Sequence, residues 1–115
     1  MKPIDVNDRM FPVDKVLYNN DEFSVIWGTW NKEDKCLGMR WNGSPVSTYP
    51  NGYPIGKGGR PIWLVIPTDL SVPFVTGLLG RRTRDGESLA DDTALLDVLQ
   101  GLLAQQTAAV ASETA

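Results

Sequence analysis

The chain of 115 residues contains no histidine and a single cysteine, Cys36. Histidine is the only side chain whose unperturbed pKa lies near neutrality, and it is also the commonest metal ligand. Without it, Cys36 lacks the base that usually activates a thiol nucleophile, and zinc has too few nitrogen and sulfur ligands. We therefore expect no catalytic residues, no metal site and no cofactor, and we expect that the protein is not an enzyme.

Long apolar runs are also missing. No segment approaches the roughly 18 consecutive apolar residues that a membrane span needs, and no apolar stretch of the kind found in a signal peptide follows the first lysine. A lone cysteine cannot form an intrachain disulfide, which agrees with a reducing compartment. These absences predict a cytoplasmic protein that does not contact a membrane.

Positive charge is in short supply, because the net charge is −3. No overall field therefore draws the molecule toward polyanions, and any nucleic-acid surface would have to be a local patch. Hydrophobic residues make up 42% and charged residues 22% of the chain, which is typical of a folded globular protein. The length favours a single domain covering residues 1–115, with residues 1–12 and 109–115 poorly ordered.

The residue types that are present change along the chain. All four tryptophans and all three tyrosines lie between residues 18 and 63, whereas residues 89–115 contain no aromatic side chain and are rich in leucine and alanine. Strand formers therefore come first and helix formers last. The sequence predicts an α+β fold in which a small antiparallel sheet of three to four strands is followed by two C-terminal helices.

A central hairpin at about residues 22–42 is the strongest local signal. Two β-prone runs flank the polar residues 31–35, and a five-residue loop there places Val25 opposite Trp41 and Gly28 opposite Gly38. The two glycines leave room on their face for another element, such as a helix. Because side chains alternate along a strand, the opposite face carries the large apolar residues that we assign to the core: Phe23, Val25, Trp27, Leu37, Met39 and Trp41.

Further elements follow from local patterns. Residues 15–18 form a short candidate strand, and the apolar run 61–67, bounded by prolines, is typical of a central strand beside the hairpin. Residues 68–80 predict one helix, and a second begins near Ser88, which has capping-box spacing to Asp91. The second helix carries a leucine stripe, and we expect a homodimer through Leu95, Leu99 and Leu102.

The glycine-rich stretch GYPIGKGGRP, residues 52–61, does not match a phosphate-binding loop. Three residues rather than four separate Gly52 from Gly56, and Lys57 is followed by glycine instead of serine or threonine. The connection of residues 43–60 is nevertheless long for a compact domain. It is either a simple connector or a recognition loop whose surface is formed by Tyr49, Tyr53, Lys57 and Arg60.

Three function classes stay open. The first is a non-enzymatic binding or adaptor protein that acts through protein contacts, with Trp30 as the exposed aromatic residue. The second is a nucleic-acid-binding module in which a basic patch combines with aromatic stacking. The third is a small-molecule-binding or catalytic domain of unknown reaction. The basic patch of the nucleic-acid-binding alternative would contain Arg81, Arg82, Arg84, Arg40, Lys57 and Arg60. Arginines that follow a helix end, however, also complement the helix dipole without any ligand.

Overall fold

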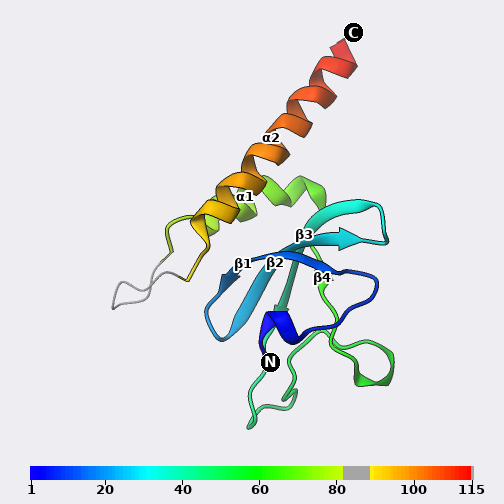
Figure 1. Ribbon diagram of the computed structural model, residues 1–115, viewed down its shortest axis with the longest axis vertical. Helices are drawn as coiled ribbons and strands as arrows, with labels where there is room; N and C mark the ends of the chain where they lie inside the picture. Colours follow the sequence, from blue (N-terminus) through cyan, green and yellow to red (C-terminus); the bar gives the residue numbers. More distant parts are fainter. Residues whose placement is uncertain (82–88, 115) are drawn as a thin grey trace.

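An antiparallel sheet followed by two helices forms the fold, which confirms the α+β class (Figure 1). The structure is a computed structural model that describes residues 1–81 and 89–114, with side chains described as far as residue 105. The four strands lie in the order β1-β2-β3-β4. Their bounds are β1 Val13–Asn19, β2 Phe23–Trp30, β3 Asp34–Trp41 and β4 Leu64–Val65, and the helices are α1 Thr68–Leu78 and α2 Asp92–Thr114. Two 3₁₀ turns complete the described elements, η1 Pro3–Asp5 and η2 Lys57–Gly59.

The central hairpin forms as predicted, but its register differs by two residues. Phe23 pairs with Trp41 and Trp30 pairs with Asp34, so the connecting turn contains residues 31–33 rather than 31–35. Asn31 and Lys32 close this shorter turn with φ angles of 52° and 67°. A shift of two residues leaves each side chain on its original face, because the side-chain period of a strand is two. The predicted assignment of side chains to the two faces of the hairpin is therefore correct, although the predicted turn is two residues too long.

The sheet is covered on both faces. On one face, α1 and α2 pack over β1, β2 and β3 (Figure 1). On the other face, the N-terminal segment and the segment before β4 form a smaller apolar cluster. Residues 1–12, for which the sequence predicts poor order, supply the buried Val6 and Phe11 to this second cluster. Its remaining buried members are Ile26, Cys36 and Trp63.

The two hairpin glycines do not face each other, because the true register pairs Gly28 with Cys36 and Gly38 with Ile26. Phe11 occupies the space that they leave. A Cβ atom on Gly28 would lie 2.6 Å from the Phe11 ring, and one on Gly38 would lie 3.1 Å from it. The element packed on this face is therefore the N-terminal segment and not a helix.

The apolar run 61–67 lies beside the hairpin, but the prediction of a central strand is wrong. Only Leu64 and Val65 pair with β3, at the edge of the sheet. Trp63 is buried in the second cluster, and its backbone N–H donates to the carboxylate of Asp8 at 3.1 Å instead of joining the ladder. The ladder with β3 therefore ends at Leu64, and Pro61 pairs instead with Ile55 in an isolated bridge.

Both helices lie where the sequence places them. The N-terminus of α2 is capped by Asp91, whose Oδ1 accepts a hydrogen bond from the N–H of Ala94 at 3.0 Å. Ser88, the predicted partner in a capping box, lies outside the described residues. Among the helices of the described residues, none combines the length and the hydropathy that crossing a membrane requires.

The leucine stripe of α2 packs within the same chain, against α1 and the sheet. Leu95 and Leu102 are buried in the main core and Leu99 is partly buried there. The leucines chosen for a dimer interface therefore contribute to the core of their own chain, and the homodimer itself stays a prediction. Leu96 and Leu103 are the exposed leucines on the described part of α2.

Candidate functional site

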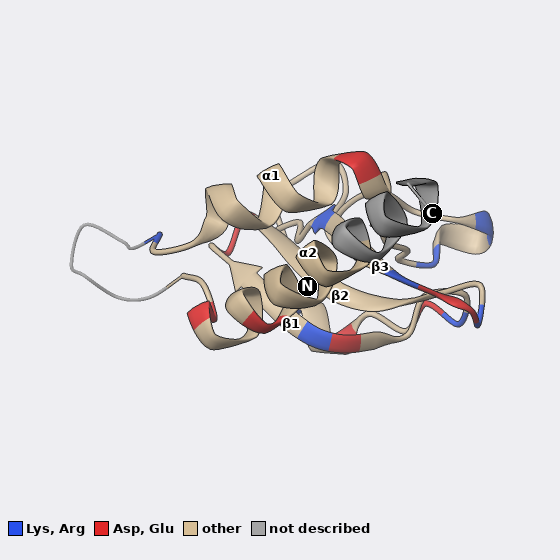
Figure 2. Ribbon diagram, turned by 90° about the horizontal axis from the view of Figure 1, so that it is seen from above, with Lys and Arg blue, Asp and Glu red and all other residues tan. Residues whose placement is uncertain are grey.

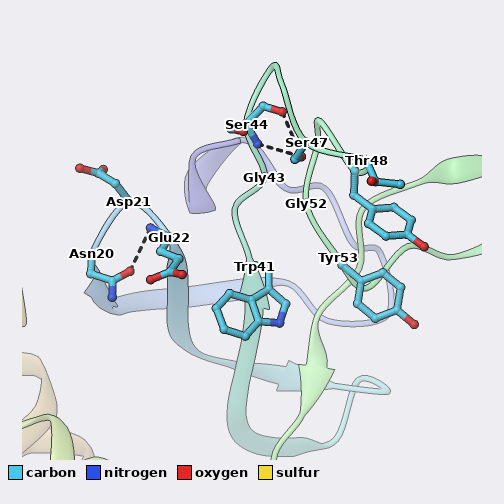
Figure 3. A pocket seen from close by; sticks show the side chains of 11 residues that line it. Asn20, Asp21, Glu22, Trp41, Gly43, Ser44, Ser47, Thr48, Gly52 and Tyr53 are labelled. Carbon is cyan, nitrogen blue, oxygen red and sulfur yellow. Dashed lines mark hydrogen bonds between the residues drawn. The ribbon is translucent and has the colours of Figure 1, made fainter.

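A groove of about 830 Å³ lies at the end of the hairpin opposite the 31–33 turn (Figure 3). It is lined by the turn between β1 and β2, by the last residue of β3, and by residues of the connection between β3 and β4. Its apolar surface comes from three large side chains, Trp41, Tyr49 and Tyr53. We call it the aromatic groove.

Two glycines allow the connection to fold back onto the end of β3. The N–H of Trp41 donates to the carbonyl of Tyr53 at 2.7 Å, and the N–H of Tyr53 donates to the carbonyl of Trp41 at 3.1 Å. A Cβ atom on Gly52 would lie 1.9 Å from the Trp41 carbonyl oxygen, and one on Gly43 would lie 2.2 Å from the Gly52 nitrogen. Both glycines also have positive φ angles, 78° at Gly43 and 85° at Gly52. Only glycine suits these positions, and the result is that Tyr53 lies directly beside Trp41.

The three aromatic side chains of the groove are about half exposed, at 47% for Trp41, 47% for Tyr49 and 49% for Tyr53. The rings of Tyr49 and Tyr53 are 5.3 Å apart, and the Trp41 ring packs edge-on against Phe23 at 5.6 Å. Directly paired residues of an antiparallel ladder project to the same face, so Trp41 and Tyr53 continue the face that α1 and α2 cover elsewhere. α1 and α2 cover the main core on that face, and Trp41 is not among the residues packed in this core. The assignment of Trp41 to the core is therefore wrong, because the helical cover does not reach it.

The opposite wall of the groove is the turn that carries Asp21 and Glu22. The side-chain oxygen of Asn19 accepts a hydrogen bond from the N–H of Asp21 at 2.9 Å, and that of Asn20 accepts one from the N–H of Glu22 at 2.9 Å. The buried Asn42 donates its amide to the same Asn19 oxygen at 2.9 Å. Local side-chain hydrogen bonds of this kind fix a turn conformation. The two acidic residues are thus presented on a braced turn.

Buried Arg40 ties the connection to the sheet. Its Nη2 donates to the carbonyl of Asn51 at 2.8 Å and its Nε donates to the carbonyl of Ile62 at 3.2 Å, so one guanidinium holds both arms of the connection. Burial lowers the pKa of Arg40. Its guanidinium lies 6.0 Å from the centre of the Trp63 ring. Arg40 therefore positions the groove, and it is not part of an exposed basic patch.

The charge around the groove is negative. Asp21 and Glu22 are among the described residues that line it, and none of those residues is a lysine or an arginine. Lys57 and Arg60 are exposed but lie outside the lining. Of the four residues named for a candidate recognition loop, the two tyrosines therefore line the groove and the two basic residues do not.

Arg81, the described arginine after α1, does not line the groove either. Arg81 comes three residues after the last residue of α1, and its Nε donates to the carbonyl of Gly77 at 2.9 Å. Arg82 and Arg84 lie outside the described residues. Basic residues appear at both ends of the molecule in Figure 2 and are not gathered in one patch among the residues drawn in colour.

Trp30 lies at the other end of β2, next to the hairpin turn. It is partly buried, and its ring packs 5.8 Å from that of Phe11. The groove residues that sequence reasoning missed are Trp41, Asp21 and Glu22. The turn-forming residues before Glu22 were a usable signal for the acidic wall, whereas the alternating pattern of β3 concealed the exposure of Trp41.

Comparison of the chain with known protein families, with curated proteins and with solved structures found no match.

Proposed function

We propose that this chain is a non-enzymatic binding or adaptor protein that docks a segment of a partner protein in the aromatic groove. The observation that carries the proposal is the half-exposed cluster of Trp41, Tyr49 and Tyr53 at one end of the sheet. Tryptophan and tyrosine are enriched at protein interfaces and among the residues that dominate binding energy. A location in the cytoplasm remains part of this proposal.

The groove is well suited to a linear segment because its walls are held before a ligand arrives. Paired backbone hydrogen bonds join Trp41 to Tyr53, and Arg40 anchors the carbonyl of the neighbouring Asn51. A binding surface that is already ordered loses less conformational entropy on association.

The nucleic-acid alternative receives less support from the same geometry. Single-stranded nucleic acid is bound by aromatic rings combined with a positively charged groove, whereas the residues at the rim here include Asp21 and Glu22. Phosphate groups would approach two carboxylates. Protein partners therefore fit the site better.

A displayed library of random 12-residue peptides, selected on the purified protein, tests the proposal. We expect selected peptides to bind at least about tenfold more weakly to Tyr53→Ala, since truncating a central interface tyrosine commonly costs about 1.4 kcal/mol or more. Leu70→Ala is the matched control, because Leu70 is a comparably exposed apolar residue on α1. Fluorescence anisotropy with labelled peptides measures the affinities, and circular dichroism verifies that both variants fold.

The proposal fails if selected peptides bind Tyr53→Ala as tightly as the unaltered protein. It also fails if a labelled dT12 oligonucleotide binds in a manner that depends on Tyr53 and weakens steeply with salt, while no peptide does so. The steep salt dependence would indicate release of counterions from phosphates.

A further inference from the structure

Two carboxylates of the aromatic groove have no basic partner within the described part of the protein. Asp21 and Glu22 both line the groove. The ion pairs found among the described residues are Lys15 with Asp97 and Lys35 with Asp14. Neither of the groove acids is therefore neutralised by a lysine or arginine of the described residues.

Glu22 and Trp41, which has the largest ring of the groove, line the same pocket. In Figure 3 the Glu22 carboxylate is on one side of the Trp41 indole, and the Tyr53 ring is on the other. A cation is attracted to the face of an aromatic ring, most strongly to tryptophan, and also to a carboxylate at close range. The groove supplies groups for both attractions, because Trp41 and Glu22 both line it.

We infer that the aromatic groove recognises a basic side chain, the guanidinium of arginine or the ammonium of lysine, in the partner segment. The cationic group lies over Trp41 beside Glu22, and the aliphatic stem of the same side chain packs on Tyr53. Long basic side chains commonly bury the stem on an apolar surface while the charge stays near water or a counter-charge. This inference depends on the proposed function and adds the chemistry of the ligand.

An anionic or purely apolar ligand fits the groove less well. A carboxylate or phosphate would be repelled by Asp21 and Glu22 and would meet the negative faces of the rings. An apolar side chain would cover the rings but would leave the carboxylates without a partner. The net charge of −3 further favours a basic partner segment during diffusional encounter.

The test uses peptides from the display selection whose binding is weakened by Tyr53→Ala. We expect each of them to contain an arginine or a lysine. Replacing the critical arginine by citrulline, or the critical lysine by norleucine, keeps the length of the side chain and removes its charge. We expect the dissociation constant to rise about tenfold, the change that corresponds to loss of a cation–π contact together with a partly exposed ion pair.

Glu22→Gln supplies the matching change on the protein. We expect it to weaken the charged peptide about threefold to tenfold and to leave the uncharged peptide unchanged, since an exposed ion pair with some support from its surroundings has this magnitude. Glu33→Gln alters the net charge equally but lies in the hairpin turn at the far end of β2 and β3. It should have no effect on either peptide.

The outcomes separate the two proposals. If peptides that depend on Tyr53 contain no basic residue, or bind equally well with citrulline or norleucine, the inference about the cation is overturned and the proposed function stands. Equal effects of Glu22→Gln and Glu33→Gln on the charged peptide would overturn the same inference. If peptide binding does not depend on Tyr53 at all, the proposed function is refuted, and the inference falls with it.

Discussion

Replacing Gly52 by alanine tests how the aromatic groove is built. Gly52 has a φ angle of 85°, and an added Cβ atom would lie 1.9 Å from the carbonyl oxygen of Trp41. Gly58, in the same connection, has a φ angle of 75° but has nothing within 4 Å of its added Cβ atom. Comparing Gly52→Ala with Gly58→Ala therefore separates two losses of unfolding free energy. Both variants lose free energy because of the positive φ angle, but only Gly52→Ala also places a Cβ atom too close to a neighbouring backbone atom.

The expected magnitudes follow from these two differences. A left-handed backbone conformation costs a residue with a Cβ atom roughly 1–2 kcal/mol, and this is the predicted loss of unfolding free energy for Gly58→Ala. In Gly52→Ala the backbone must also move away from Trp41. That movement breaks the two hydrogen bonds between Trp41 and Tyr53, each worth about 1 kcal/mol net. We predict a total loss of about 3–4 kcal/mol for Gly52→Ala.

Urea denaturation followed by tryptophan fluorescence measures both losses, and native-state amide hydrogen exchange locates them. The amides of Trp41 and Tyr53 should exchange much faster in Gly52→Ala and at the unaltered rate in Gly58→Ala. This role of Gly52 is refuted if the two variants lose the same free energy, or if the Trp41 amide keeps its protection in Gly52→Ala.

Two further predictions concern the second face of the sheet. Gly28→Ala should lower the unfolding free energy by about 2–3 kcal/mol, because its Cβ atom would overlap the buried Phe11 ring. The comparison variant is Gly77→Ala in α1, which has open space around it and should raise the unfolding free energy by up to about 1 kcal/mol. Equal changes in the unfolding free energy of the two variants, measured by urea denaturation, would contradict this prediction. Burial and, to a smaller extent, the charge of Asp34 raise the pKa of the Cys36 thiol above its ordinary value of 9.0. Above that pH the unfolded chain loses the thiol proton first, so the unfolding free energy should fall with rising pH more steeply in the unaltered protein than in Cys36→Ala. Parallel pH profiles of the two proteins between about pH 7 and about pH 10.5 would show that the thiol is not shielded.

The hairpin shows why a sequence predicts the sheet face of each side chain better than its partner on the neighbouring strand. Alternation along each strand depends on that strand alone, so Val25 and Leu37 are assigned correctly to the main core. The partner of each residue depends on the length of the turn. Asp34 and Lys35 are polar because they are exposed at the end of β3, and this made a three-residue turn look like one of five residues.

The aromatic groove shows the opposite case. Trp41 continues the apolar alternation of β3, and only the distance to which the helices extend over the sheet determines whether it is buried. The backbones of Gly43 and Gly52 approach each other closely, and this places Tyr53 beside Trp41, although the two aromatic residues are twelve positions apart in the sequence. The acidic wall comes from a third segment, the turn at Asp21 and Glu22.

The amino-acid sequence alone determined where the hairpin and the two helices form and which side of the hairpin is apolar, because propensity and periodicity act between neighbours in the chain. It also determined that histidine chemistry is absent. The tertiary structure decided that β4 lies at an edge, that Phe11 fills the space beside two glycines, that Arg40 is buried and that Trp41 is exposed. Those outcomes depend on contacts between residues far apart in the sequence, whose free energies cannot be assigned until the elements are placed against one another.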